Sequence, residues 1–405
     1  MREMKDSGVE WIGCVPKDWV LNKGKFLFVQ RNDRGNTICL QLLSPTQKYG
    51  VIPQDEYEEL SGMKAVKLNE KVNLAELKTV HAGAYCISLR SFQGGFEYSN
   101  YEGVVSPAYQ IFYPRGKVNV DYYKYLFKTE GFIQEMNSFT MSLRDGKNIA
   151  FEDFGNSLLP VPSINEQNNI ADFLNSKCAE IDALSADIQK EIETLQEYRK
   201  SVITEAVTKG LDPNVEMKDS GIERIGEIPR QWNITKVKFL VSDIKSGETN
   251  NSLILEDGLF PVYGGGSQIG YSDNWNTENN ILIGRVGAKC GCVTRISGKA
   301  WATDNALIVV SDNSDWLYYA FIALDLHNLN TSNAQPLITA SKVMNCFLPF
   351  PSLGEQLKII SFLDSKCSEI DSIVADKQKQ LETLAKYRKS LIYEYVTGKK
   401  EVPIC

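Results

Sequence analysis

Two arginines stand where short β-rich runs end beside glycine-rich turns. Arg90 is followed by Gln93-Gly94-Gly95, and Arg285 is followed by Gly287-Ala288-Lys289. A guanidinium is a planar fork of donors that matches a guanine edge or a phosphate group. The pattern is therefore suited to nucleic-acid recognition, and it is equally compatible with a surface salt bridge or a solvated cation.

Further polar residues accompany these arginines at similar places in the two halves of the chain. Ser106 to Tyr109 in the first half stand where Thr303 to Ala306 stand in the second, and each half then closes on a polar, loop-like segment. The sequence alone does not say which residue would read which base. The candidate DNA-contacting residues are Arg90, Ser91, Gln93, Ser106, Tyr109, Arg144, Lys147, Tyr263, Ser267, Arg285, Lys289 and Gln335.

No motif for catalysis is found. The glycine cluster Tyr263–Gly270 looks like a phosphate cradle, but it does not lie between a strand and a helix, and no Lys-Ser/Thr follows it. A tight β-turn that lets the backbone approach a neighbour closely fits better. With only His81 and His327 in the chain, neither a catalytic triad nor a metal site is indicated. We expect a non-catalytic chain that holds no metal and no cofactor.

The elements that would position these residues occur twice. Residues 4–27 align with 217–240 at 14 identities in 24, around turn residues and the aligned tryptophans Trp19 and Trp232. Residues 159–208 align with 348–397 at 30 identities in 50. We call residues 4–27 and 217–240 the box. The chain thus consists of a box, a variable region and a helix, and this order occurs twice. We expect both tryptophans to be buried on their own domains; a partner-binding role is the alternative.

Each repeat ends in a long predicted helix. Leu-Pro-x-Pro enforces an extended entry, Ser163 and Ser352 are the expected caps, and Glu166 and Glu355 would complete capping boxes. The first helix, predicted over 165–208, would span about 65 Å. Its apolar residues follow a heptad pattern, so we expect the two copies to pair. The predicted seam is Ile181, Leu184, Ile188, Leu195, Tyr198, Ile370, Ile373, Leu384 and Tyr387.

Both variable regions mix short β-rich runs with one aromatic helix in the same order. The predicted fold class is α+β, with two pseudo-symmetric domains separated by a long antiparallel two-helix coiled coil. The expected boundaries are 1–158 for the first domain, 159–210 for the first helix, 211–347 for the second domain and 348–405 for the second helix.

Composition limits the environment and the partners. No apolar run is long enough to cross a membrane, and the first residues are too charged for a signal peptide. Nine cysteines without a CxxC pair suggest reduced thiols, so we expect a soluble cytoplasmic protein. The formal net charge is −7, and a count of charges segment by segment finds no basic domain, which weighs against nucleic-acid binding over the whole surface.

Three duplicated features together resemble the specificity subunit of type I restriction–modification systems. They are the Ser-Gly-x-Glu-x-Ile-Gly-x-x-Pro-x-x-Trp box, the Leu-Pro-x-Pro-x-x-x-Glu-Gln helix entry and the long helix ending in Tyr-Arg-x-Ser. The resemblance covers the whole chain. It implies two target-recognition domains that read a split, asymmetric site in double-stranded DNA, with the helix pair setting the unread gap.

The same resemblance implies assembly with two methylase subunits and with restriction subunits. S-adenosylmethionine and ATP would then belong to those partners. A coiled-coil adaptor that grips proteins and reads no DNA remains the alternative, and the acidic charge favours it. An enzyme with an unrecognised site has little support in the residues.

Overall fold

The computed structural model describes residues 2–34, 41–65, 74–87, 95–139, 149–249, 254–329 and 336–403. The chain divides into two compact units, one formed by residues 1–187 with 380–405 and the other by residues 188–379. Each unit contains one α+β domain and a portion of both long helices. The duplicated sequence therefore corresponds to a duplicated architecture.

The first unit is built around a four-stranded antiparallel sheet in the order β4-β11-β8-β9. Two-stranded pairs β1-β2, β3-β12, β5-β6 and β7-β10 surround this sheet. Phe28, Phe112 and Phe127 lie in an aromatic core, where the ring of Phe28 meets Phe112 edge-to-face and Phe127 at a tilt. The elements are β1 (Met4–Asp6), β2 (Cys14–Pro16), β3 (Val20–Lys23), α1 (Gly24–Leu27), β4 (Phe28–Arg31), β5 (Leu43–Thr46), β6 (Gly50–Pro53), α2 (Gln54–Ser61), β7 (Lys78–Val80), β8 (Tyr85–Ile87), β9 (Phe96–Tyr98), β10 (Gly103–Val105), β11 (Gln110–Pro114), α3 (Val120–Leu126), α4 (Glu130–Ser138), α5 (Phe151–Asn156) and β12 (Leu158–Val161).

The second unit repeats that sheet in the order β16-β23-β20-β21, again with every pair antiparallel. Its second sheet, β18-β17-β22-β19, also corresponds to strands of the first unit. There β5-β6 and β7-β10 form the same antiparallel pairs, and a parallel bridge between Leu42 and Val104 joins β10 to the start of β5. The elements are β13 (Met217–Asp219), β14 (Glu227–Pro229), β15 (Asn233–Lys236), η3 (Val237–Phe239), β16 (Asp243–Ser246), β17 (Phe260–Gly264), β18 (Ser267–Ser272), β19 (Thr277–Glu278), β20 (Ile281–Gly284), η5 (Gly287–Lys289), β21 (Val293–Arg295), β22 (Lys299–Ala302), β23 (Ala306–Val310), α7 (Ser314–Ala323), α8 (Ala340–Met344) and β24 (Phe347–Phe350).

The common sheet confirms that one α+β domain was built twice. The first sheet strand follows the box, the next two in sequence form a hairpin, and the fourth returns between them and the first. The Leu-Pro-x-Pro strand then pairs with the last strand of the box, in β3-β12 and in β15-β24. The helix entry is therefore extended, as its prolines predict.

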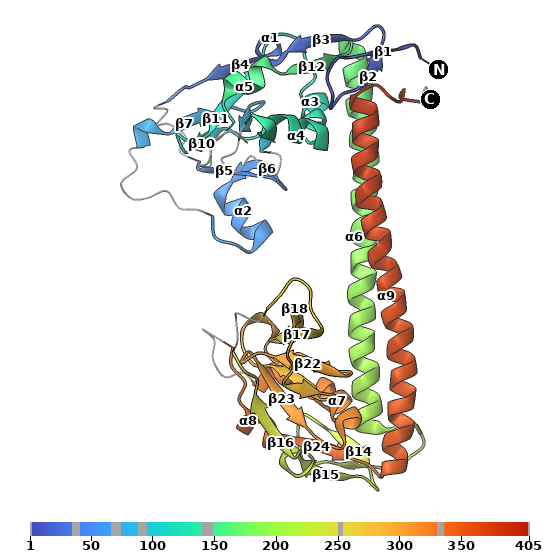
Figure 1. The fold of residues 1–405 in the computed structure, drawn as a ribbon. Helices are drawn as coiled ribbons and strands as arrows, with labels where there is room; N and C mark the ends of the chain where they lie inside the picture. The colour runs from blue at the N-terminus through green and yellow to red at the C-terminus, as the bar shows by residue number, and fades with distance from the viewer. Residues whose placement is uncertain are drawn as a thin grey trace. The chain divides into compact units, whose positions relative to one another are not determined.

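The long helices are α6 (Ile164–Lys209) and α9 (Leu353–Val396), close to their predicted limits. In each unit they lie side by side and run in opposite directions (Figure 1). Asp182 pairs with Arg388 at 3.3 Å in the first unit, and Arg199 pairs with Asp371 at 3.0 Å in the second. These two ion pairs occupy equivalent repeat positions with the helices exchanged, which shows the pseudo-twofold relation at the level of side chains.

The predicted seam is wrong at four positions. Leu184, Tyr198, Ile373 and Tyr387 have 49%, 53%, 41% and 54% of their surface exposed. The less exposed positions lie one residue further on, because the heptad continues through polar Ser185 and through Arg199 and Arg388. Of the other predicted members, Ile181, Ile188 and Ile370 are buried, and Leu195 and Leu384 are half-buried. The heptad positions are Leu174, Cys178, Ile181, Ser185, Ile188, Ile192, Leu195, Arg199, Val202 and Ala206 on α6, and Leu363, Cys367, Ile370, Val374, Lys377, Leu381, Leu384, Arg388, Leu391 and Tyr395 on α9.

Both box tryptophans are buried, as predicted, and each is tied to the start of a long helix. Trp19 Nε1 donates to Glu166 at 2.9 Å, and Trp232 Nε1 donates to Glu355 at 3.1 Å. Ser163 caps α6 by accepting from the backbone of Glu166 at 3.3 Å. The helix-entry glutamates thus bind the tryptophan of the box, a role that the capping-box prediction did not include.

Replacing Glu355 with glutamine should destabilise the second unit. Burial opposes ionisation of Glu355, but hydrogen bonds from Trp232, Ser352 and Gln231 outweigh it and lower its pKa. We expect a loss of about 1 kcal/mol in unfolding free energy at neutral pH, at the low end for a charged acceptor because the site is half-exposed.

Because the folded-state pKa of Glu355 is lowered, its contribution is complete above the unfolded value of about 4.3 and is lost as the pH falls through the folded value. Thermal unfolding from pH 7 to pH 3 should therefore show the difference between wild type and Glu355→Gln shrinking. The exposed Glu382 of α9 provides the control, since Glu382→Gln should change neither the midpoint nor its pH dependence. A constant difference at all pH values would contradict the assignment.

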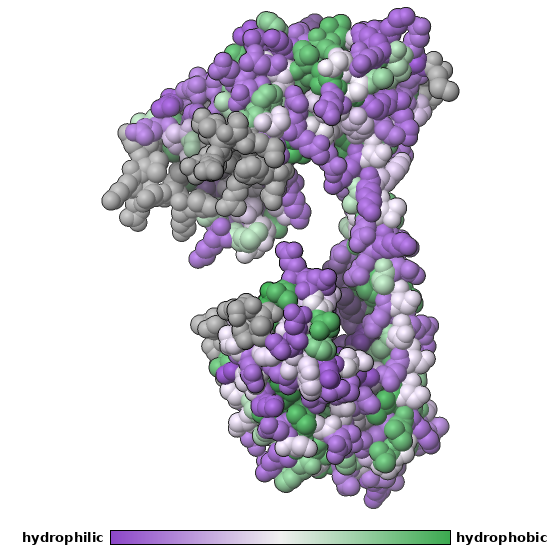
Figure 2. Space-filling view, in the orientation of Figure 1, coloured by the Kyte–Doolittle hydropathy of each residue, from purple (hydrophilic) through white to green (hydrophobic). Residues whose placement is uncertain are grey.

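The visible surface of the helix pair is largely hydrophilic, with apolar residues scattered over it (Figure 2). Within the described ranges, no helix has the length and apolar character that crossing a membrane requires.

Candidate nucleic-acid interface

Arg285 lies directly after β20, at the end of the common sheet. Its Nη1 donates to Ser246 Oγ at 3.3 Å, and its backbone N–H donates to the carbonyl of Asn305 at 2.9 Å. Its Nε is buried and has no acceptor among the described residues. The guanidinium is thus held at the sheet end by one weak side-chain contact, with donor capacity left over.

The glycine turn between β17 and β18 packs against the segment that follows Arg285. Gly265 and Gly266 have φ values of +52° and +110°, which favour glycine. A Cβ on Gly284 would clash with the carbonyl oxygen of Gly265, and one on Gly266 would lie 2.8 Å from Cys292 Cβ. The close backbone approach predicted from the sequence is therefore an approach to the protein's own 284–292 segment.

These contacts gather the described candidates of the second domain along one edge. The carbonyl of Tyr263 accepts from the backbone of Thr303 at 2.9 Å, and Thr294 Oγ1 donates to the carbonyl of Gly266 at 3.3 Å. Tyr263 and Ser267 flank the turn, while Arg285 and Lys289 lie on the segment beneath it. The edge also includes Ser246 and Asn305, which sequence reasoning missed, although Asn305 lies in the Thr303–Ala306 stretch that parallels Ser106–Tyr109.

In the first domain, Ser106 and Tyr109 form the turn between β10 and β11. The backbone N–H of Tyr109 donates to the carbonyl of Ser106 at 3.2 Å, and Lys78 Nζ donates to the carbonyl of Tyr109 at 2.7 Å. Burial of Lys78 lowers its pKa, and the neighbouring Arg34 lowers it further. Lys78 therefore contacts this turn and has Arg34 as its neighbour, and the sequence analysis identified neither cation.

The remaining candidates, Arg90, Ser91, Gln93, Arg144, Lys147 and Gln335, lie outside the described residues. The end of β8 and the end of β20 are nevertheless equivalent in the two sheets. In the sequence, Arg90 comes three positions after the last residue of β8, and Arg285 comes directly after the last residue of β20.

The edge in the second domain is suited to recognition by hydrogen bonding. Arginine matches guanine, asparagine matches adenine, and serine or lysine can contact a base or a phosphate. Across the parts of the chain that the structure describes, no group of three His, Cys, Asp or Glu side chains could hold a metal ion. Charged and polar donors at a rigid sheet end are an arrangement for binding rather than for acid–base chemistry.

Comparison with known proteins assigns this fold to a family. The family model for the type I restriction–modification DNA specificity domain matches residues 17–194 and again residues 229–383, so the chain belongs to that family and carries its domain twice. It is a specificity subunit, the non-catalytic component that determines the DNA target.

Individual relatives agree with this assignment. The specificity subunit of the MjaVIII type I restriction enzyme from Methanocaldococcus jannaschii is 25% identical, over 96% of this chain and 94% of the relative. The EcoprrI specificity subunit from Escherichia coli is 33% identical over 27% of this chain and 28% of its own length. A chain from a structure of type I restriction–modification complex assembly shares the fold, with a TM-score of 0.67, 13% identity and coverage of 95% of this chain and 99% of that one.

Proposed function

We propose that the chain reads a bipartite, asymmetric DNA target, with one half-site read by residues 1–158 and the other by residues 211–347. The observation that carries this proposal is the repeated fold: both domains present equivalent strand ends, while the residues of the strands and of the segments that connect them differ. Equivalent reading edges with unlike side chains are suited to two unlike half-sites.

The long helices, 159–210 and 348–405 with their flanks, are proposed to set the unread gap between the half-sites. Half-sites read from one face of B-DNA lie about 34 Å apart, one helical turn. The 46 residues of α6 extend over about 69 Å, enough to support such a separation without a flexible linker.

Assembly with two methylase subunits, and with restriction subunits, completes the proposal. The box, the helix entry and the long helix, which together we call the frame, occur twice in the chain. The same partner can therefore bind two equivalent surfaces, which supports two methylases for each chain. Those subunits would supply S-adenosylmethionine chemistry and ATP-driven restriction in the cytoplasm. The net charge of −7 fits a chain whose outer faces meet proteins and whose DNA contacts are confined to local edges.

Mapping of methylated bases in DNA from cells that carry the chain and its methylase tests this function. The expected result is one asymmetric motif in two parts with a constant gap. Cells with the methylase alone provide the control and should lack the motif. If the complete complex produced no sequence-specific methylation, the protein-only adaptor would be the better description.

A further inference from the structure

An exposed phenylalanine occurs at the same repeat position in both halves of the chain. Phe26, in α1, has 57% of its surface exposed, and Phe239, in η3, has 71%. Each ring lies next to the lysine that precedes it, with Lys25 Nζ at 5.8 Å and Lys238 Nζ at 4.8 Å from the ring centre. We call the two places the Lys-Phe patches.

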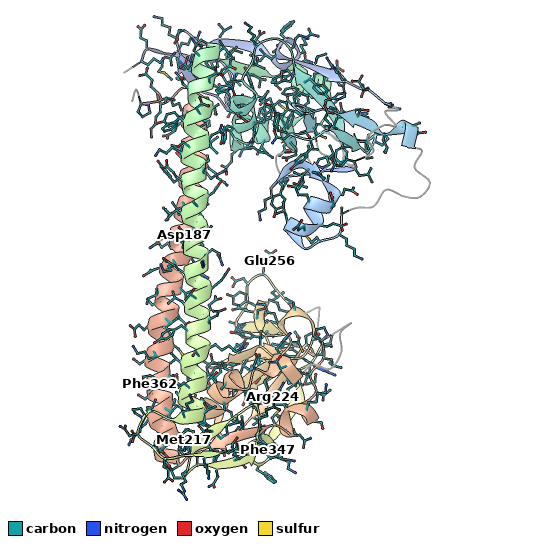
Figure 3. The ribbon with its side chains drawn as sticks, turned by 180° about the vertical axis from the view of Figure 1, so that it is seen from behind. Asp187, Met217, Arg224, Glu256, Phe347 and Phe362 are labelled. Atoms are coloured by element: carbon teal, nitrogen blue, oxygen red, sulfur yellow. The ribbon has the colours of Figure 1, made fainter. Side chains whose placement is uncertain are left out.

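Each Lys-Phe patch extends onto the neighbouring two-stranded sheet. In the second unit, Lys236 pairs across the strands with Phe347, and its Nζ lies 5.0 Å from that ring. Figure 3 labels Phe347 on this part of the second unit. In the first unit, Lys23 pairs with Leu158 at the same register. Both patches thus combine two lysines with two apolar side chains on the frame, outside the variable loops.

A single exposed apolar residue is ordinary and needs no explanation. The repetition is different, because 10 of the 24 box positions have diverged between the halves while Lys-Phe-Leu has not. The leucine has a packing role in the first unit, where Leu27 belongs to the core. The phenylalanine is exposed in both units, so a packing role does not account for its retention.

The location of the patches argues against DNA as their ligand. In the second unit, β15 and β24 lie at the opposite end of the domain from the β17–β18 hairpin, whose turn belongs to the candidate interface (Figure 1). The two proposed half-sites also differ, whereas the patches share their chemistry. A function common to both halves is the binding of one kind of partner twice.

We propose that each Lys-Phe patch docks one methylase subunit, through a segment of that subunit that carries carboxylates beside an apolar side chain. The proposal rests on the methylase assembly proposed above. The paired lysines supply the charge complementarity, and the exposed ring supplies the apolar contact that a water-exposed phenylalanine otherwise lacks. Two patches on one chain would then give two methylases for each specificity subunit.

The test compares Phe26→Ala, Phe239→Ala and the double variant, each as the full chain mixed with purified methylase. Native mass spectrometry at a fixed methylase concentration gives the stoichiometry. Wild type should bind two methylases, each single variant one, and the double variant should lose at least tenfold in binding at both sites. Leu60→Ala in the first unit and Leu259→Ala in the second remove other exposed apolar side chains and should leave two methylases bound.

Circular dichroism and the thermal midpoint should be unchanged in all variants, since no core side chain is altered. Two methylases on the double variant, or loss of both from either single variant, would overturn the proposal. If wild-type chain bound no methylase, the proposed function itself would fail instead, which separates the two results.

Discussion

Insertion of seven residues into both long helices is expected to change the gap in the recognised target and to leave the two half-sites unchanged. A copy of residues 181–187 would follow Asp187, and a copy of residues 380–386 would precede Gln380, where the chain passes between its two units. One heptad adds about 10 Å and keeps the seam in phase. The preferred gap should lengthen by about three base pairs, with modification of the original spacing reduced at least a hundredfold.

The measurement is methylation of duplexes that carry the same half-sites at a series of gaps. Insertion into α6 alone is the matched control, because Asp182–Arg388 and Arg199–Asp371 could not then both form with the helices in register. That variant should assemble poorly and modify no spacing efficiently. A double-insertion variant that still preferred the original gap would show that the helices do not set the separation.

The box and the long helices could be predicted because each occurs twice in the sequence. An internal repeat identifies the box, the helix entry and the helix without any knowledge of the fold, and Trp19 and Glu166 recur as Trp232 and Glu355. Their pairing was not predicted, since a glutamate three residues after a serine also fits a capping box. The helix-capping pattern identified the two glutamates, but only the folded structure showed that each accepts a hydrogen bond from a tryptophan of the box.

The contact positions between the two long helices could not all be predicted from the spacing of apolar residues. Leu184 and Tyr198 are apolar, and they precede Ser185 and Arg199 by one residue, so a search for apolar spacing selects the wrong helical position twice. Arg199 can occupy a heptad position between the helices because its guanidinium forms an ion pair with Asp371 on α9. The sequence of α6 alone cannot predict this ion pair, because Asp371 lies on α9.

The candidate interface of the second domain depends on contacts between segments that are far apart in the sequence. Arg285 was identified because it follows a β-rich run, but its partners are Ser246 at the end of β16 and Asn305 directly before β23. The antiparallel order β16-β23-β20 brings these three segments together. Strand order of this kind follows from long-range pairing, which periodicity within one segment cannot supply.

Replacing Arg285 with alanine is expected to weaken recognition of one half-site only. Among the described residues, its guanidinium makes one side-chain hydrogen bond, from Nη1 to Ser246 Oγ at 3.3 Å, and we expect its other Nη N–H groups to donate to a base edge or a phosphate. Loss of a bidentate base contact costs about 1–3 kcal/mol, which corresponds to roughly a tenfold to hundredfold loss in affinity for the cognate duplex. Methylation mapping should show relaxed sequence preference at one position.

The pattern of controls makes this prediction specific. Arg285→Lys keeps the charge without the planar fork, so it should retain nonspecific DNA binding and still lose discrimination. Arg230→Ala removes an exposed arginine of the box that is paired with Glu216, and it should change neither affinity nor preference. A uniform loss across all sequences, with a shallower salt dependence, would make Arg285 a phosphate contact. Relaxation in both half-sites at once would contradict the assignment of one half-site to each domain.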